Sequence, residues 1–103
     1  MWIDNQTSDQ SQIKICLYKT NDSFDWIPVG AGVFTVQQGE TQHWEAPAGE
    51  GLSAYHIIAF HPAFFDRRLC DLNDAPTGGR FAVRGGNGSY TLAQTSSRAA
   101  QAA

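Results

Sequence analysis

Between Gln12 and Leu92, short apolar-rich runs are interrupted by turn-forming residues roughly every eight to twelve residues. Short runs rich in β-branched and aromatic residues alternate with Gly, Pro, Asn and Asp, and no stretch of ordinary helix length shows a 3.6-residue apolar period. Several short strands separated by turn residues at this spacing are typical of a β-sandwich. The pattern therefore predicts an all-β protein, a single antiparallel β-sandwich of seven or eight short strands.

The clearest expected strand covers residues 13–19, where Ile13, Ile15 and Leu17 recur at every second position. Because successive side chains of a strand point to opposite faces, these three form the predicted core set, and Cys16 is expected on the other face. The other expected strands are residues 2–5, 33–36, 41–46, 53–61, 80–84 and 89–92.

Two of these segments carry further signals. The last pair of strands is predicted to form a hairpin, because Asn87-Gly88 supplies the positive φ that both central residues of a tight turn need. The segment 53–61 is apolar on both faces apart from its histidines, which fits a central strand or one whose second face meets a partner. Residues 62–69 suit at most one short helical turn, and a strand through this segment fits about equally well.

With 103 residues the chain is expected to form one domain. We assign residues 1–93 to the sandwich and the polar, Ala-rich residues 94–103 to a flexible C-terminal tail. Neither a signal peptide nor a transmembrane segment is predicted, because the first residues lack a basic region and an apolar stretch. Secretion as part of a longer precursor stays open.

The formal net charge is −3 and no run of like charges occurs, so a nucleic-acid partner is not expected. Arg67 and Arg68 are the nearest approach to a basic cluster. On a regular strand these neighbours would point to opposite faces, and they are therefore not expected to form one patch.

Two cysteines, Cys16 and Cys70, are too few for a disulfide scaffold. Two small buried side chains are favoured over a single bridge between strands. Asn5, Asn21 and Asn87 each begin an N-x-S/T triplet, for which turn chemistry is favoured over glycosylation.

Signatures of catalysis are missing from the sequence: it has no G-x-S-x-G elbow, no phosphate loop and no dinucleotide fingerprint. No catalytic residue and no cofactor are therefore predicted, and a hydrolytic or metal-dependent enzyme is the third alternative. His43, His56 and His61 are weak metal candidates, with Glu45 as a further ligand beside His43. Ordinary strand histidines are favoured, since His56 and His61 are expected on opposite faces.

The candidate binding residues are Phe24, Asp25, Trp26 and Ile27, in the long connection before residue 33. Connections lie on the surface, and an exposed aromatic patch there marks a contact with a membrane lipid, a glycan or a protein. The alternative is that these side chains plug the open end of the sandwich. The function expected is a non-catalytic, lipid-binding or lectin-like recognition module.

The second functional alternative is a structural homo-oligomer subunit. It rests on the segment 53–61, apolar on both faces, together with Phe64 and Phe65. A sandwich of this size has little interior, so a partner subunit could supply the cover for a second apolar face.

The first half of the chain also contains three sequence motifs in a recognisable order. W-I-D-N-Q-T and I-K-I-C-L-Y-K are followed by G-V-F-T-V-Q-Q-G-E, which leads into a strand bearing Trp44. This layout resembles the opening half of small sandwich proteins such as the aegerolysins, and faintly that of thaumatin-like domains. The chain is shorter than a typical aegerolysin, its second half does not match, and it has far fewer cysteines than thaumatin-like proteins. The resemblance implies a lipid- or membrane-recognising module, or one component of a pore-forming pair.

Overall fold

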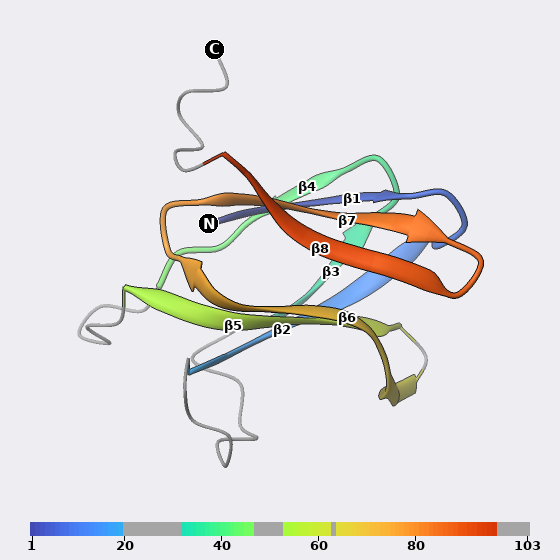
Figure 1. Cartoon of the computed structure of the whole chain (residues 1–103), viewed down its shortest axis with the longest axis horizontal. Helices are drawn as coiled ribbons and strands as arrows, with labels where there is room; N and C mark the ends of the chain where they lie inside the picture. The colour runs from blue at the N-terminus through green and yellow to red at the C-terminus, as the bar shows by residue number, and fades with distance from the viewer. Residues whose placement is uncertain (20–31, 47–52, 63, 97–103) are drawn as a thin grey trace.

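A computed structural model describes residues 1–19, 32–46, 53–62 and 64–96. They form two packed β-sheets, which confirms the predicted all-β sandwich (Figure 1). The strands are β1 (Trp2–Thr7), β2 (Gln12–Lys19), β3 (Val33–Gln37), β4 (Thr41–His43), β5 (Ala54–His61), β6 (Phe64–Pro76), β7 (Arg80–Gly86) and β8 (Ser89–Ser96). In this part of the chain no helix is long and apolar enough to cross a membrane.

One four-stranded sheet, sheet A, has the order β4-β1-β7-β8, and the other, sheet B, has the order β3-β2-β5-β6. Sheet B is antiparallel throughout, but in sheet A β1 runs parallel to β7, so the prediction of a wholly antiparallel sandwich was wrong in this respect. Parallel neighbours need a long connection between them. Here that connection is nearly the whole chain, from β2 to β6.

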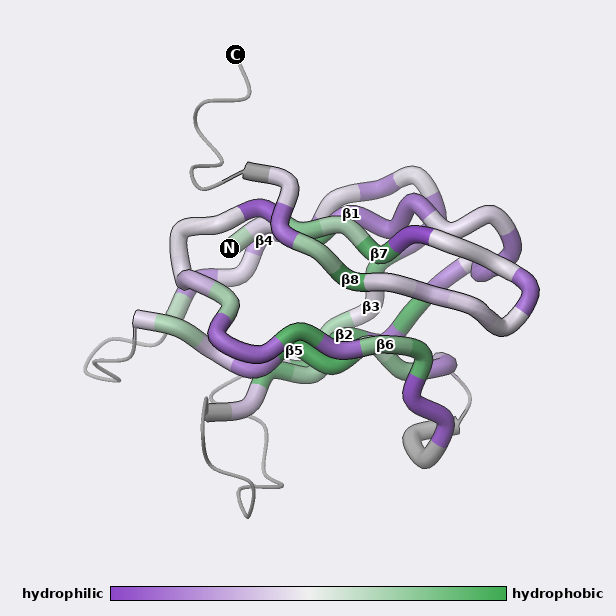
Figure 2. Tube along the Cα trace, viewed as in Figure 1, coloured by the Kyte–Doolittle hydropathy of each residue, from purple (hydrophilic) through white to green (hydrophobic). Residues whose placement is uncertain are grey.

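The core lies between the two sheets, where the apolar stretches of the chain gather (Figure 2). Ile13, Ile15 and Leu17 are completely buried there, as predicted from their alternation along β2. From sheet A, Ile3 and Phe81 are buried against the same cluster. Burying side chains of this size contributes about 1.5–3 kcal/mol each, so this shared face is what holds the two sheets together.

β6 departs most from expectation, because it is a 13-residue strand, whereas a short helical turn and a strand over residues 62–69 had been considered equally. No helical turn is present between Phe64 and Pro76. The strand also continues past Leu72, where no strand was expected, because pairing with β5 continues as far as Ala54 opposite Pro76. Elsewhere β4 ends at His43, three residues before the predicted end.

β8 is also longer than expected and runs to Ser96, into the segment assigned to the C-terminal tail. The hairpin that joins β7 to β8 is confirmed. Asn87 and Gly88 have φ of 55° and 84°, the left-handed values that a tight two-residue turn requires.

β5 is a central strand, flanked by β2 and β6, and both of its faces are covered. On the face away from the core, Ile58 and Phe60 are only 3% and 8% exposed and form a second apolar cluster with Cys16. A single chain therefore buries Ile58 and Phe60 on this second face, which removes one of the two reasons for expecting a partner subunit. The other reason, the side chains of Phe64 and Phe65, lies outside what the structure describes. The homo-oligomer itself stays a prediction.

Asn5 is a structural residue. Its side chain is 0% exposed, and its amide group donates hydrogen bonds to the backbone carbonyls of Gln10 (3.2 Å) and Val36 (3.1 Å). Its side-chain oxygen accepts hydrogen bonds from the backbone N–H and the hydroxyl of Thr7 (3.1 and 2.7 Å). The folded chain leaves no room for a glycan on Asn5, and Asn21 lies outside the described residues.

The substitution Asn5→Ala is expected to lower the free energy of unfolding by about 2–4 kcal/mol, because it leaves several buried backbone groups without partners. Denaturant unfolding followed by tryptophan fluorescence measures this loss. Asn73→Ala is the matched control, since the exposed Asn73 side chain accepts a hydrogen bond from the backbone of its neighbour Asp74, and a change within about 0.5 kcal/mol is expected. Equal effects of the two substitutions would contradict the structural role of Asn5.

Candidate functional site

A pocket of about 390 Å³ lies at the end of the sandwich that holds the β7–β8 hairpin. One wall comes from the β1–β2 connection and the hairpin of sheet A, and the other from the end of β5 and the first half of β6 in sheet B. The described lining residues are Gln10, His61, Arg67, Arg68, Leu69, Gly88 and Tyr90. This volume is within the range of small-molecule binding sites.

Arg67 and Arg68 both line the pocket, so the prediction that they would not form one patch was wrong. The physical reason is an irregularity in the pairing of β5 with β6. Phe60 lies opposite Arg68 and His61 opposite Phe64, so three residues of β6 have no counterpart on β5. Such a bulge interrupts the two-residue alternation and redirects side chains. Both arginines therefore border the same concave site, while the Arg68 guanidinium also lies near Asp71 on the outer face of sheet B.

The opposite wall is fixed by hydrogen bonds centred on Asp9. Its carboxylate accepts the backbone N–H of Asn87 (2.9 Å) and the hydroxyl of Tyr90 (2.9 and 3.0 Å to the two oxygens). Gln10 Nε2 donates to the same hydroxyl oxygen of Tyr90 (2.9 Å). Ser8 adds a backbone hydrogen bond to Gly85 (2.8 Å). The hairpin is therefore held to the β1–β2 connection, and this sets the position of the Tyr90 ring at the pocket.

The pKa of Asp9 is lowered from its ordinary value by the hydrogen bond from the Asn87 N–H and by the Tyr90 hydroxyl. Both donors favour the charged carboxylate. The contact between hairpin and connection is thus formed by an ionised group throughout the neutral range.

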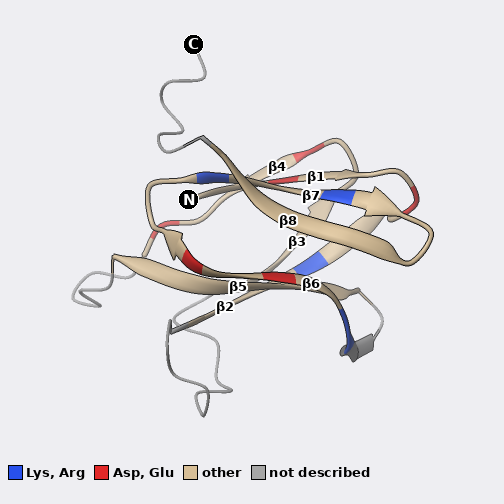
Figure 3. Cartoon of the chain, in the orientation of Figure 1, with Lys and Arg blue, Asp and Glu red and all other residues tan. Residues whose placement is uncertain are grey.

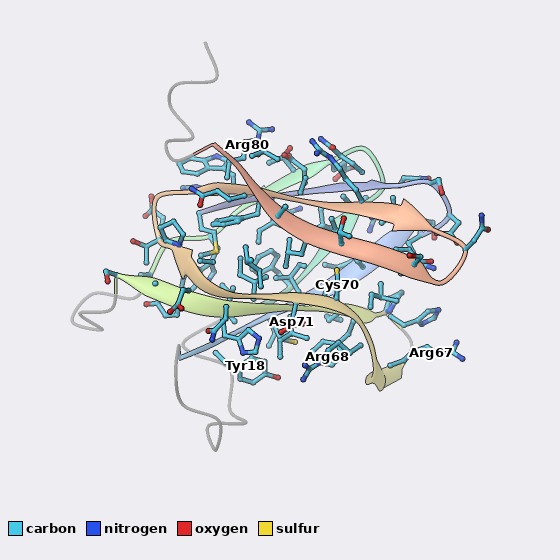
Figure 4. All side chains as sticks on the ribbon, in the orientation of Figure 1. Tyr18, Arg67, Arg68, Cys70, Asp71 and Arg80 are labelled. Atoms are coloured by element: carbon cyan, nitrogen blue, oxygen red, sulfur yellow. The ribbon has the colours of Figure 1, made fainter. Side chains whose placement is uncertain are left out.

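The basic side of the pocket continues onto the outer face of sheet B. Arg68 Nη1 lies 4.0 Å from Asp71 Oδ2, and the same oxygen lies 2.8 Å from His56 Nε2. Figure 4 shows Arg67, Arg68 and Asp71 along β6, with Tyr18 on the same outer side. None of the described residues that line the pocket is acidic, so these described residues together carry a net positive charge from the two arginines.

The residues predicted to bind a ligand, Phe24, Asp25, Trp26 and Ile27, lie outside the described residues, and their role stays a prediction. The pocket was not predicted. Its lining residues come from three separate parts of the chain and share no spacing that a motif could capture. The adjacent arginines were the one available signal, and regular strand geometry argued against it.

The three histidines do not come together. His43 lies in sheet A, while His56 and His61 lie in sheet B. His43 Nε2 is 3.8 Å from Glu45 Oε1, so the expected neighbour is present. Among the described residues, however, no group of three His, Cys, Asp or Glu side chains could hold a metal ion.

On the outer face of sheet A the most constrained charged group is Asp4. Arg80 donates to both of its carboxylate oxygens (2.9 Å each), and the hydroxyl of Thr41 donates to one of them. Burial alone raises the pKa of Asp4, but these hydrogen bonds and the charge of Arg80 outweigh it, and the pKa is lower than normal. Beside this pair the rings of Trp2 and His43 stack with their centres 4.1 Å apart.

Cys16 and Cys70 are free thiols, as the favoured prediction expected, and Cys16 is buried whereas Cys70 is only half-buried. Cys16 belongs to the apolar cluster on the outer face of sheet B, whereas Cys70 packs against the main core. Burial, and then the charge of Asp71, raise the pKa of Cys70 to about 11. Burial also raises the pKa of Cys16.

Comparison with known proteins gives no assignment. No protein-family model matches the chain, no curated protein matches it, and no solved structure matches it. The resemblance to the aegerolysins is therefore supported only in its coarse part, a small all-β protein with two four-stranded sheets.

The contact between hairpin and connection predicts a specific pH dependence. A carboxylate with a lowered pKa holds its partners above about pH 4 and releases them as the pH falls through that lowered value. The amide resonance of Asn87 is expected to titrate in NMR spectra with a midpoint below that of an ordinary aspartate. In Asp9→Asn this step should disappear. An Asn87 resonance that is unchanged between neutral pH and pH 2 would contradict the contact.

Proposed function

We propose that this protein is a non-catalytic recognition module that binds an anionic group in the pocket between the two sheets. The observation that carries the proposal is the pair Arg67 and Arg68 on one concave surface, together with Tyr90 and Gln10. Guanidinium groups present several N–H donors in a fixed plane, which suits phosphate, sulfate and carboxylate.

The shape of the pocket supports the same proposal. Tyr90 and Leu69 offer apolar surface beside the arginines, so the pocket suits an anionic group attached to a ring or a short apolar segment. The Tyr90 wall is held by Asp9 before any ligand arrives. A site that is already ordered loses less conformational entropy on binding.

Two sources could supply such a group. One is the phosphate of a lipid headgroup at a membrane surface, and the other is an acidic glycan that carries sulfate or carboxylate. The resemblance to the aegerolysins adds weight to the lipid, but the chemistry of the pocket is common to both. A protein surface and a hydrolytic or metal-dependent activity are the remaining alternatives from the sequence.

The double substitution Arg67→Gln with Arg68→Gln tests the pocket. Each lost charged hydrogen bond is worth about 1.5–3 kcal/mol, so affinity for the bound anion should fall by about 10-fold or more. Binding is measured separately with vesicles containing an anionic phospholipid and with a sulfated oligosaccharide. The ligand that the protein binds identifies the source of the anionic group.

Arg84→Gln is the matched control for this measurement. Arg84 is an exposed arginine that donates to Gln6 in sheet A (2.7 Å) and does not line the pocket. Its substitution should leave binding unchanged. Equal losses in the double variant and in Arg84→Gln would indicate non-specific attraction, and an absence of binding by the wild-type protein in both arms would overturn the proposal.

The aromatic connection is a second, independent part of the recognition proposal. If Trp26 contacts a membrane or glycan, Trp26→Ala should reduce affinity about 10-fold to 100-fold, because burial of one large side chain contributes about 1.5–3 kcal/mol. Trp2→Phe, at the stacked pair with His43, is the matched tryptophan control. Equal binding by the Trp26→Ala variant and the wild-type protein would dispose of this role.

A further inference from the structure

The four edge strands of the two sheets differ in how they are protected. An exposed edge offers unpaired backbone N–H and C=O groups to any added strand, and natural proteins limit this with charges, bulges or short length. β4 is three residues long. β6 carries charged residues and has an irregular register with β5.

β8 is less protected, because its one irregularity of pairing with β7 lies at its C-terminal end, at Thr95. Its eight residues, S-Y-T-L-A-Q-T-S, include no charge, no proline and no glycine. Figure 3 shows no acidic or basic position along this strand. Thr91 and Ala93 are exposed on the outer face, and among the described strands β8 pairs with β7 alone. β3 is also uncharged, but it spans only five residues.

We propose that β8 is an interface at which a second copy of this chain adds its own β8 in antiparallel orientation. The ladder would join the two A sheets into one continuous sheet. A second copy is the occupant that the charge pattern favours. A twofold axis places each strand against its own sequence, and like charges directly opposite one another would be destabilising. The neutral strand β8 meets this condition, whereas the charged strand β6 does not.

The symmetry also limits the register. A twofold axis normal to the sheet keeps the outer faces on the same side, so outward residues must lie opposite outward residues. In the registers that overlap most of the strand, Ala93 lies either directly opposite the Ala93 of the second copy or diagonally across from it. Thr91 lies on the same outer face as Ala93 and can form cross-strand pairs.

A single added strand gives a small interface, so we expect an equilibrium that depends on protein concentration rather than a permanent dimer. Sedimentation and light scattering should show dimer appearing as the concentration rises toward about 1 mM, the range in which weak complexes form. At the same time amide exchange should slow selectively along β8. A wild-type protein that stays monomeric over this range would overturn the proposal.

Charge substitutions at the exposed position 93 test the interface directly. Ala93→Lys and Ala93→Glu should each be monomeric alone, because like charges then meet across the axis. An equimolar mixture of the two should recover dimer, which also shows that neither variant is merely misfolded. Gln37→Lys, on the uncharged edge strand β3, is the matched control and should dimerise like the wild-type protein. The assignment to β8 would be overturned by any of three results. These are dimer formation by either position-93 variant alone, no recovery of dimer in the mixture, and loss of dimer in Gln37→Lys.

Discussion

β1 enters sheet A between β4 and β7, and its residues from Trp2 to Thr7 lie in register with β7 from Arg80 to Gly85. Almost the whole chain separates these two strands, so their pairing requires both sheets to be assembled around it. The same ladder places Asp4 beside Arg80, where a largely buried carboxylate is compensated by two hydrogen bonds from one guanidinium group. Removing one partner of such a pair leaves an uncompensated charge, which makes the register of β1 costly to change.

The pocket depends on this register. Beyond the end of β1, Ser8 bonds to Gly85 and Asp9 bonds to Asn87 and Tyr90, so a shift of β1 would separate the hairpin from the β1–β2 connection. Arg67 and Arg68 belong to sheet B, and they line the pocket where the pairing of β5 with β6 is interrupted by the bulge. The pocket therefore depends on the exact register of β1 with β7 in sheet A and on the irregular pairing of β5 with β6 in sheet B.

Local features of the fold could be predicted because their physical cause is local. The two-residue alternation of Ile13, Ile15 and Leu17 identified both a strand and its buried face. Asn87-Gly88 identified the hairpin, since few other dipeptides accept positive φ at both positions. The free state of the cysteines followed from Cys16 lying out of phase with the core set.

The remaining features depend on pairing between distant segments, for which the sequence carries no local signal. Nothing in the residues of β1 states that its neighbour is β7 or that the two run parallel. The length of β6 was missed because Asn73, Asp74 and Pro76 are common in turns, although pairing with β5 keeps them in the strand. The pocket was missed for the same reason, since both Arg67 and Arg68 line it only where the pairing of β6 with β5 is irregular.

The two thiols have a practical consequence for the chemistry of the molecule. Cys16 and Cys70 lie on opposite faces of sheet B (Figure 4 shows Cys70 between the two sheets), and Cys16 is buried while Cys70 is half-buried. With a pKa of about 11, only about one Cys70 in ten thousand is ionised at neutral pH, and the ionised form is the one that reacts. A cysteine introduced at an exposed turn would therefore react far faster than either native one. Spectroscopic probes could be attached at single chosen positions without first removing the natural thiols.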